Sequence, residues 1–140
     1  MRLLIALFAL CIVVSCGGRE SYIDMQPVDA YNWHKPVSII YDNSDTVSMR
    51  SIAIALRYNK SFKSDTLTVK VQTSLPAAFQ YSESILLRLR REYKATAMTA
   101  SECVGYRENC LLSERGCYIF TITPCRNVSG IEAVGIEIAE

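Results

Sequence analysis

The feature that most constrains this chain is a set of short segments in which apolar and polar residues alternate. Between Thr66 and Thr73, leucine and valine occupy every second position and are separated by threonine, lysine and glutamine. A period of two places the apolar side chains on one face of a half-buried β-strand. The same period recurs in four further segments, at residues 37–41, 47–58, 118–123 and 131–138. Strands are therefore expected to make up most of the fold.

Turn-forming residues separate these segments. Clusters of Asp, Asn, Ser and Gly occur at residues 42–45, 59–61 and 127–130, and Pro76 and Pro124 interrupt the alternation elsewhere. Residues 84–93 fit either a strand or a short helix, and their neighbours favour a strand. No long helical pattern is convincing. The sequence predicts an all-β fold, an antiparallel β-sandwich of the Ig-like or jelly-roll kind, over residues 37–140.

The N-terminus has the three parts of an export signal. Arg2 precedes an apolar run over residues 3–14, which is shorter than the roughly 20 residues that span a bilayer. The run ends at Val13-Val14-Ser15-Cys16, which resembles the bacterial lipobox. This resemblance implies that residues 1–15 are removed as a lipoprotein signal peptide and that the Cys16 thiol carries a lipid. The alternative is an ordinary signal peptide that ends in a chance cysteine.

Stable anchoring by acyl chains requires two or more of them. Gly17 and Gly18 would supply a flexible tether directly after the anchor, and we expect a lipidated tether over residues 16–36. The lipid on Cys16 would then be the protein's contact with the membrane. Gly17 is no inner-membrane retention signal, so the predicted location is the cell outer membrane.

The charge balance disfavours nucleic acid as a partner. The chain has 15 basic and 14 acidic side chains, and removal of Arg2 with the signal leaves 14 of each. A neutral chain lacks the electrostatic signature of a nucleic-acid-binding protein.

Four cysteines follow Cys16, and three interpretations of them are open. An even number of cysteines in an exported protein commonly forms disulfides. We expect two disulfides of unspecified connectivity that fasten an irregular segment at residues 94–116. Gaps of six, six and seven residues lack the close pairs typical of a zinc site. Four free, buried thiols are the third possibility. The residues concerned are Cys103, Cys110, Cys117 and Cys125.

No motif predicts catalysis or a cofactor. His34 is the only histidine, and no serine or acid occupies a known nucleophile motif. The oxygen-rich segment at residues 42–45 lacks the length and spacing of a calcium loop, so a turn is the better interpretation. We therefore expect a non-enzymatic protein without metal or cofactor.

The order of several segments resembles a known family. An aromatic start with Tyr31 and Trp33 precedes the segment SIAIALRYN at residues 51–59, and the chain closes on SGIEAVGIEIAE at residues 129–140. With the lipobox, this order is similar to the gliding-motility lipoprotein H family of small β-rich envelope proteins. The resemblance implies a part in surface gliding or in the coupled secretion machinery. It implies no catalytic residues.

Two functions follow from these observations. The first is a lipid-anchored structural or assembly component with envelope protein partners. The alternative is a surface glycan-binding module, in which aromatic side chains form a stacking platform. The same side chains suit the interior of a sandwich equally well. The residues of this platform would be Tyr22, Tyr31, Trp33 and Tyr41.

Overall fold

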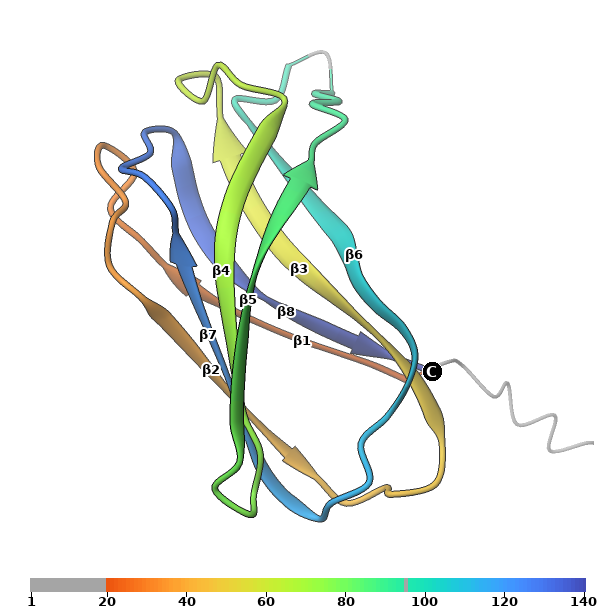
Figure 1. The fold of residues 1–140 in the computed structure, drawn as a ribbon. Helices are drawn as coiled ribbons and strands as arrows, with labels where there is room; N and C mark the ends of the chain where they lie inside the picture. Colours follow the sequence, from red (N-terminus) through yellow and green to blue (C-terminus); the bar gives the residue numbers. More distant parts are fainter. Residues whose placement is uncertain (1–19, 95) are drawn as a thin grey trace, which may run out of the picture.

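A computed structural model describes residues 20–94 and 96–140, which form two antiparallel sheets of four strands each (Figure 1). One sheet has the order β1-β8-β3-β6 and the other β2-β7-β4-β5. The predicted all-β sandwich is therefore confirmed. The strands are β1 (Ser21–Pro27), β2 (Val37–Asn43), β3 (Met49–Asn59), β4 (Thr66–Ser74), β5 (Gln80–Arg88), β6 (Thr99–Leu111), β7 (Gly116–Pro124) and β8 (Ile131–Ala139).

The pairing of the strands is nested. β4 pairs with β5, β3 with β6, β2 with β7 and β1 with β8, all antiparallel. The chain is thus one long hairpin folded over into two sheets, which is the double-sheet arrangement of a jelly roll. Of the two sandwich types that the sequence left open, the topology is that of the jelly roll.

The core lies between the sheets and is built from the alternating segments. In β3, Ile52, Ile54, Leu56 and Tyr58 are all buried. They face the buried positions of β4 and β7 across the sandwich, because every second side chain of a strand points to the same face. The largest fully buried side chains are Trp33, Tyr58, Phe120, Ile39, Ile54, Leu56, Leu67, Leu87, Ile122, Ile131, Ile136 and Ile138.

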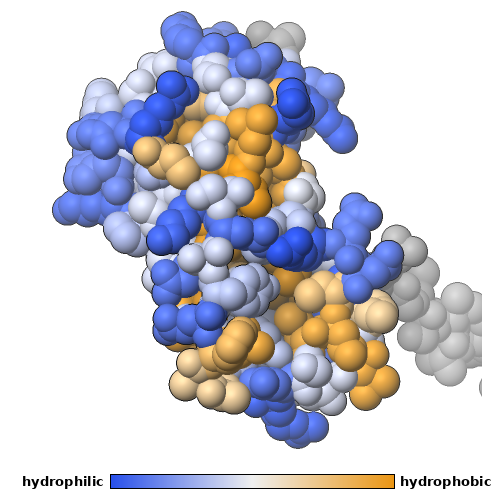
Figure 2. Space-filling view, in the orientation of Figure 1, coloured by the Kyte–Doolittle hydropathy of each residue, from blue (hydrophilic) through white to orange (hydrophobic). Residues whose placement is uncertain are grey.

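The two flanks of the sandwich are closed differently. At one flank, the Tyr22 hydroxyl in β1 donates a hydrogen bond to the Ile40 carbonyl in β2 at 3.1 Å, and the Tyr22 and Tyr41 rings lie 5.0 Å apart. At the other flank, side chains link β5 to β6. The Glu83 carboxylate accepts a hydrogen bond from Tyr106 at 2.5 Å and forms an ion pair with Arg107. In Figure 2, apolar residues gather along the middle of the face that carries β4 and β5.

The predicted tether over residues 16–36 was too long. Ser21–Pro27 is β1, an edge strand that pairs with β8 from Ser21↔Ala139 to Pro27↔Ala133. Its sequence shows little alternation because both of its faces are largely exposed. β1 can pack closely against β8 because position 135 is a glycine. A Cβ atom at Gly135 would overlap the Asp24 carbonyl oxygen. Cys16 and the expected signal peptide lie outside the described residues.

The expected irregular segment at residues 94–116 is also wrong, because residues 99–111 form the long edge strand β6. Apolar and polar residues alternate only weakly in β6, since the acidic residue Glu102 occupies one of the inward-facing positions. The Glu102 carboxylate accepts a hydrogen bond from the Tyr58 hydroxyl at 3.0 Å. Burial, followed by this hydrogen bond, raises the pKa of Tyr58 to about 12. The half-buried Glu102, which the sequence pattern treats as a surface residue, thus has a hydrogen-bond partner in the core residue Tyr58.

The expected disulfides are absent, and Cys103, Cys110, Cys117 and Cys125 are free thiols. Cys103 and Cys110 both lie on β6, seven residues apart, and a strand advances about 3.3 Å per residue. They are separated by roughly 23 Å, whereas a disulfide needs Cα atoms within about 7 Å. Cys117 is exposed near the start of β7 and Cys125 is exposed directly after its end, about 26 Å apart along the strand. The thiols are free among the described residues, but three of them are exposed and one is half-buried, so the expectation of buried thiols is not met.

Candidate binding surface at the loop end

Four connections meet at one end of the sandwich, which we call the loop end: residues 28–36, 60–65, 89–98 without residue 95, and 125–130 (Figure 1). Backbone hydrogen bonds join the first and last of them. Trp33 and Val128 exchange two, at 2.7 and 3.0 Å, and the Gly130 amide donates to the Ala30 carbonyl at 2.7 Å. The loop end is therefore built from segments far apart in the sequence.

Side chains fasten the other two connections to each other, and Gly130 packs closely against one of them. Arg91 donates to the Phe62 and Lys63 carbonyls at 3.2 Å each, and the Tyr93 hydroxyl donates to the Asn59 carbonyl at 3.1 Å. Gly130 has a φ of 89°, and a Cβ atom there would overlap the Phe62 amide nitrogen. A glycine is needed at this point for both reasons. The four connections thus form one cross-linked surface.

The loop end is strongly basic. Its connections contain seven basic and three acidic side chains, a difference of +4. The four ion pairs among the described residues involve Arg50, Arg57 and Arg107, and none uses a basic residue of the loop end. All of these basic side chains except the half-buried Arg91 are exposed. The basic residues are Lys35, Lys60, Lys63, Arg90, Arg91, Lys94 and Arg126.

Three shallow hollows in this surface share Ser61 in their lining. Their volumes are about 400, 480 and 280 Å³. The first is also lined by Lys60 and Lys63, the second by Tyr31 and the third by Arg126. Together they place cationic, hydroxyl and aromatic groups around one exposed serine. The Glu132 carboxylate also lines the first two hollows, and it forms an ion pair with Arg57 at 3.7 Å. The hydrophilic character of this end is visible along the upper margin of Figure 2.

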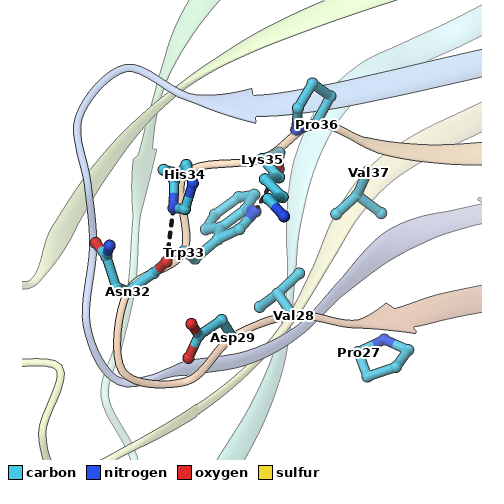
Figure 3. A pocket seen from close by; sticks show the side chains of 9 residues that line it. All are labelled: Pro27, Val28, Asp29, Asn32, Trp33, His34, Lys35, Pro36 and Val37. Atoms are coloured by element: carbon cyan, nitrogen blue, oxygen red, sulfur yellow. Dashed lines mark hydrogen bonds between the residues drawn. The ribbon is translucent and has the colours of Figure 1, made fainter.

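A separate hollow of about 410 Å³ lies in the 28–36 connection (Figure 3). Trp33 lines it, but the Trp33 side chain is only 1% exposed and its Nε1 donates to the Lys35 carbonyl at 2.8 Å. The His34 Nδ1 lies 3.0 Å from the Asn32 carbonyl oxygen, so the histidine contacts a backbone group of its own loop. This hollow contains the His34 imidazole, the Asp29 carboxylate and the Lys35 amine, and its lining includes no serine, threonine or cysteine.

The four aromatics of the expected stacking platform do not form one surface. Trp33 and Tyr41 are buried, Tyr22 packs on Tyr41, and only Tyr31 is freely exposed, at 91%. The platform interpretation is therefore wrong for this set of residues. Tyr31 remains as a single exposed ring at the loop end.

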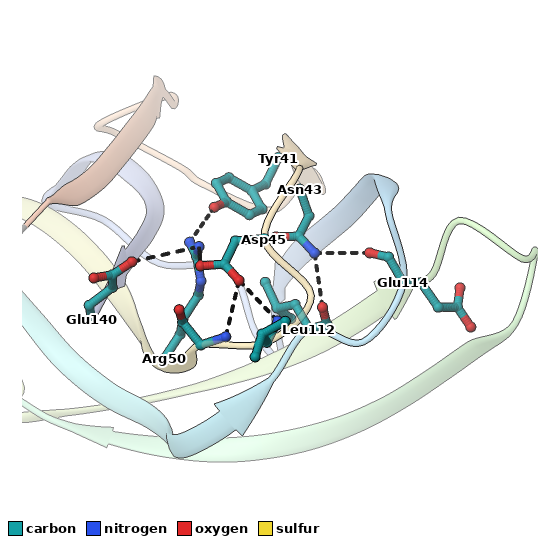
Figure 4. A network of polar contacts seen from close by, with 9 residues as sticks. Tyr41, Asn43, Asp45, Arg50, Leu112, Glu114 and Glu140 are labelled. Atoms are coloured by element: carbon teal, nitrogen blue, oxygen red, sulfur yellow. Dashed lines mark hydrogen bonds and ion pairs between the residues drawn. The ribbon is translucent and has the colours of Figure 1, made fainter.

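A network of polar contacts holds the opposite end of the sandwich (Figure 4). Arg50 contacts the Tyr41 hydroxyl at 2.6 Å, Asp45 at 3.2 Å and Glu140 at 3.9 Å. Hydrogen bonds from the Ser48 side chain and from the Val47 and Ser48 amides hold the pKa of Asp45 well below its usual range. The segment at residues 42–45, considered above for calcium, thus ends a strand and begins a turn.

The buried amide of Asn43 completes this network. Its Nδ2 donates to the Leu112 and Glu114 carbonyls, at 2.9 Å each, and so ties β2 to the connection between β6 and β7. Every contact in the network joins parts of the fold to one another. The opposite end therefore owes its polar residues to structure, whereas among the basic side chains of the loop end only Arg91 donates hydrogen bonds within the described part of the chain, and none forms an ion pair with it.

A further hollow contains a cysteine. Tyr58, Glu102 and Cys103 line it with three other residues, and its volume is about 270 Å³. Partial burial, with Glu137 and Glu102 nearby, raises the pKa of the Cys103 thiol to about 11. The thiol is then protonated at neutral pH, which makes it a weak nucleophile. No group of three or more potential metal ligands occurs among residues 20–94 and 96–140.

No protein-family model and no curated protein matches this chain. The similarity to the gliding-motility lipoprotein H family therefore stays a prediction. Within the described part of the chain, no helix is long and apolar enough to cross a membrane.

The basic surface is not visible in the net charge of the whole chain, which is nearly zero. Its residues nevertheless lie in or beside segments with turn residues: Lys60 and Lys63 at the cluster 59–61, and Arg126 directly before the cluster 127–130. What the sequence does not show is that these two segments meet.

Proposed function

We propose that the protein is anchored by a lipid on Cys16 and serves as a non-enzymatic component of a cell-envelope assembly, with the loop end as its outward-facing surface. The observation that carries this proposal is the position of β1. Ser21 pairs with Ala139, at the end of the sandwich opposite the loop end. Five residues from Cys16 to Ser21 reach at most about 18 Å. A lipid on Cys16 would therefore hold this end close to the bilayer.

The loop end would then point away from the membrane. An 11-residue strand such as β3 spans roughly 37 Å, so the loop end would lie several tens of ångströms farther from the bilayer than the anchored end. The outer membrane is the location that the residue after the lipobox cysteine favours. The resemblance to the gliding-motility lipoprotein H family supports a place in a motility or secretion complex, with protein partners in the envelope.

The anchoring is tested by Cys16→Ala. We expect the variant to leave the detergent-extracted membrane fraction and to appear in the aqueous fraction, because the variant has no site for the lipid. The matched control is Cys103→Ala, which removes an exposed free thiol and should leave the protein in the membrane fraction. Membrane retention of the Cys16 variant would overturn the anchoring proposal.

The assembly role is tested by crosslinking intact envelopes and purifying the full chain. Crosslinks from Lys63 at the loop end to the same envelope protein in repeated experiments would support it. Crosslinks that form equally from Lys70, an exposed lysine on β4, would indicate random collision. A chain recovered without any specific partner would contradict an assembly role.

A further inference from the structure

We propose that the loop end binds an anionic polysaccharide, a sugar chain that carries carboxylate or phosphate groups. This inference goes beyond the anchoring and assembly role and does not depend on it. It assigns a ligand chemistry to the surface around Ser61.

The first argument is uncompensated charge. Seven basic side chains gather on connections with three acidic ones, and none of the seven is in an ion pair with the described residues. The opposite end has the reverse character: residues 42–50, 75–79 and 112–115 with Glu20 and Glu140 contain two basic and five acidic side chains. The attraction for an anion is therefore local to the loop end. A concentrated patch of one sign raises the local concentration of oppositely charged ligands.

The second argument is the kind of polar group beside the charges. Ser61, Asn127 and Ser129 are exposed, and their side chains make no hydrogen bond to the described residues. Hydroxyl and amide groups both donate and accept, which matches the hydroxyl groups of a sugar. These groups line hollows that also contain Lys63 and Arg126, so cations and neutral hydrogen-bonding groups face the same space.

The third argument is Tyr31. Its ring is 91% exposed and lines the hollow that contains Ser61 and Ser129. An exposed ring beside polar groups offers an apolar face on which the C–H face of a sugar ring can pack. Its backbone is held by the contacts of the 28–36 connection, including the bond from the Tyr31 amide to the Asp29 carboxylate at 3.0 Å.

An acidic peptide fits this surface less well. Extended peptides commonly bind by adding to a sheet edge or by placing apolar side chains in pockets. The loop end consists of connections rather than an exposed strand edge, and the hollows around Ser61 are lined mainly by polar residues. A sugar chain with anionic groups matches both the charges and the hydroxyl-rich lining.

The test measures binding of the full chain in detergent to polygalacturonate by calorimetry. Neutral dextran and poly-glutamate are the comparison polymers. We expect binding to polygalacturonate that weakens with added salt, because exposed charges are screened. Binding to dextran should be absent, and binding to poly-glutamate clearly weaker. No binding to polygalacturonate, or equal binding to poly-glutamate, would overturn the proposal.

Two matched double variants locate the site. Lys60→Glu with Lys63→Glu should weaken binding by about tenfold, which corresponds to two reversed surface charges. Lys70→Glu with Arg115→Glu alters the net charge equally, at exposed positions outside the loop end, and should leave binding nearly unchanged. Equal weakening by the two variants would show attraction without a site.

Tyr31→Ala separates sugar binding from simple ion exchange. The variant should lose several-fold in affinity while the salt dependence stays the same, because the substitution removes a ring and no charge. Since Tyr31 is almost fully exposed, the fold should be unaffected, and an unchanged melting temperature verifies this. Unchanged affinity would contradict the recognition of a sugar ring.

Discussion

At the scale of single residues, Ile136 shows how much the core depends on one position. It lies in β8 with no exposed surface and packs between the sheets. We expect Ile136→Asp to destabilise the fold by several kcal/mol, because it buries an unpaired charge. The matched control is Ile40→Asp, at a position that is 58% exposed on β2. Thermal melts of both variants test this, and a melt of Ile136→Asp close to that of Ile40→Asp would contradict it.

Asp45 predicts a dependence of stability on pH. Its pKa is lowered in the folded state by hydrogen bonds from Ser48 and Val47, with Arg50 adding to the effect. A lowered folded-state pKa contributes stability above the unfolded value of about 3.9, and the contribution is lost as the pH falls through the folded value. The melting temperature of Asp45→Asn should therefore lie below that of the wild type at about pH 6, and the difference should narrow as the pH falls from about 4 toward about 2. A constant difference over this range would indicate that the carboxylate charge is unimportant.

At the scale of elements, the pairing of β1 with β8 depends on the absence of a side chain at Gly135. A side chain at Gly135 would overlap the β1 backbone at Asp24, so Gly135→Val should detach β1 while leaving the remaining strands in place. Gly105→Val is the matched control, because the nearest group to a Cβ atom there is Glu108 at 4.0 Å. Hydrogen exchange of the amides at residues 21–27 measures the effect. Slow exchange in the Gly135 variant would show that β8 tolerates the side chain.

The sequence predicts the strands that bury one face and misses those that do not. The segments around Leu67, Ile54 and Ile136 alternate clearly because their apolar faces line the core. β1 and β6 are edge strands with mostly exposed or half-buried side chains, so the hydrophobic pattern that marks a strand is weak in both. In the ambiguous segment at residues 84–93, the strand interpretation is confirmed for residues 84–88, which end β5, whereas residues 89–93 belong to the connection to β6.

The candidate surface could be predicted less well than the fold. Its residues are individually visible as basic or polar loop residues, such as Lys63 and Arg126. Their meeting depends on the contacts of Trp33 with Val128 and of Arg91 with Phe62, which join segments separated by up to 95 residues. Alternation reports which face of a strand is buried and contains no information on which loops share an end. The aromatics were misjudged for the same reason, since burial of Trp33 is a property of the assembled loops.

At the scale of the whole molecule, charge is sorted between the two ends. The loop end has an excess of four basic side chains, and the opposite end, where β1 begins, has an excess of three acidic ones. An anchored domain with this distribution would present its basic surface away from the bilayer, while its acidic end would be repelled by anionic lipid headgroups. Charge and anchor position would then favour the same orientation, in which the loop end is free to meet its ligand.

The nested pairing of the strands also sets an order of assembly. β4 and β5 are joined by a short connection and can pair as soon as both have been made, whereas β1 must wait for β8, whose partner residues lie up to 118 positions later. Distant pairings are slow to form because the intervening chain must first be closed into a loop. The nascent chain would thus keep its first strand unpaired until the last strand has been synthesised. If the protein is exported as proposed, such a delay would leave the segment next to the signal unpaired and able to thread through a translocation channel.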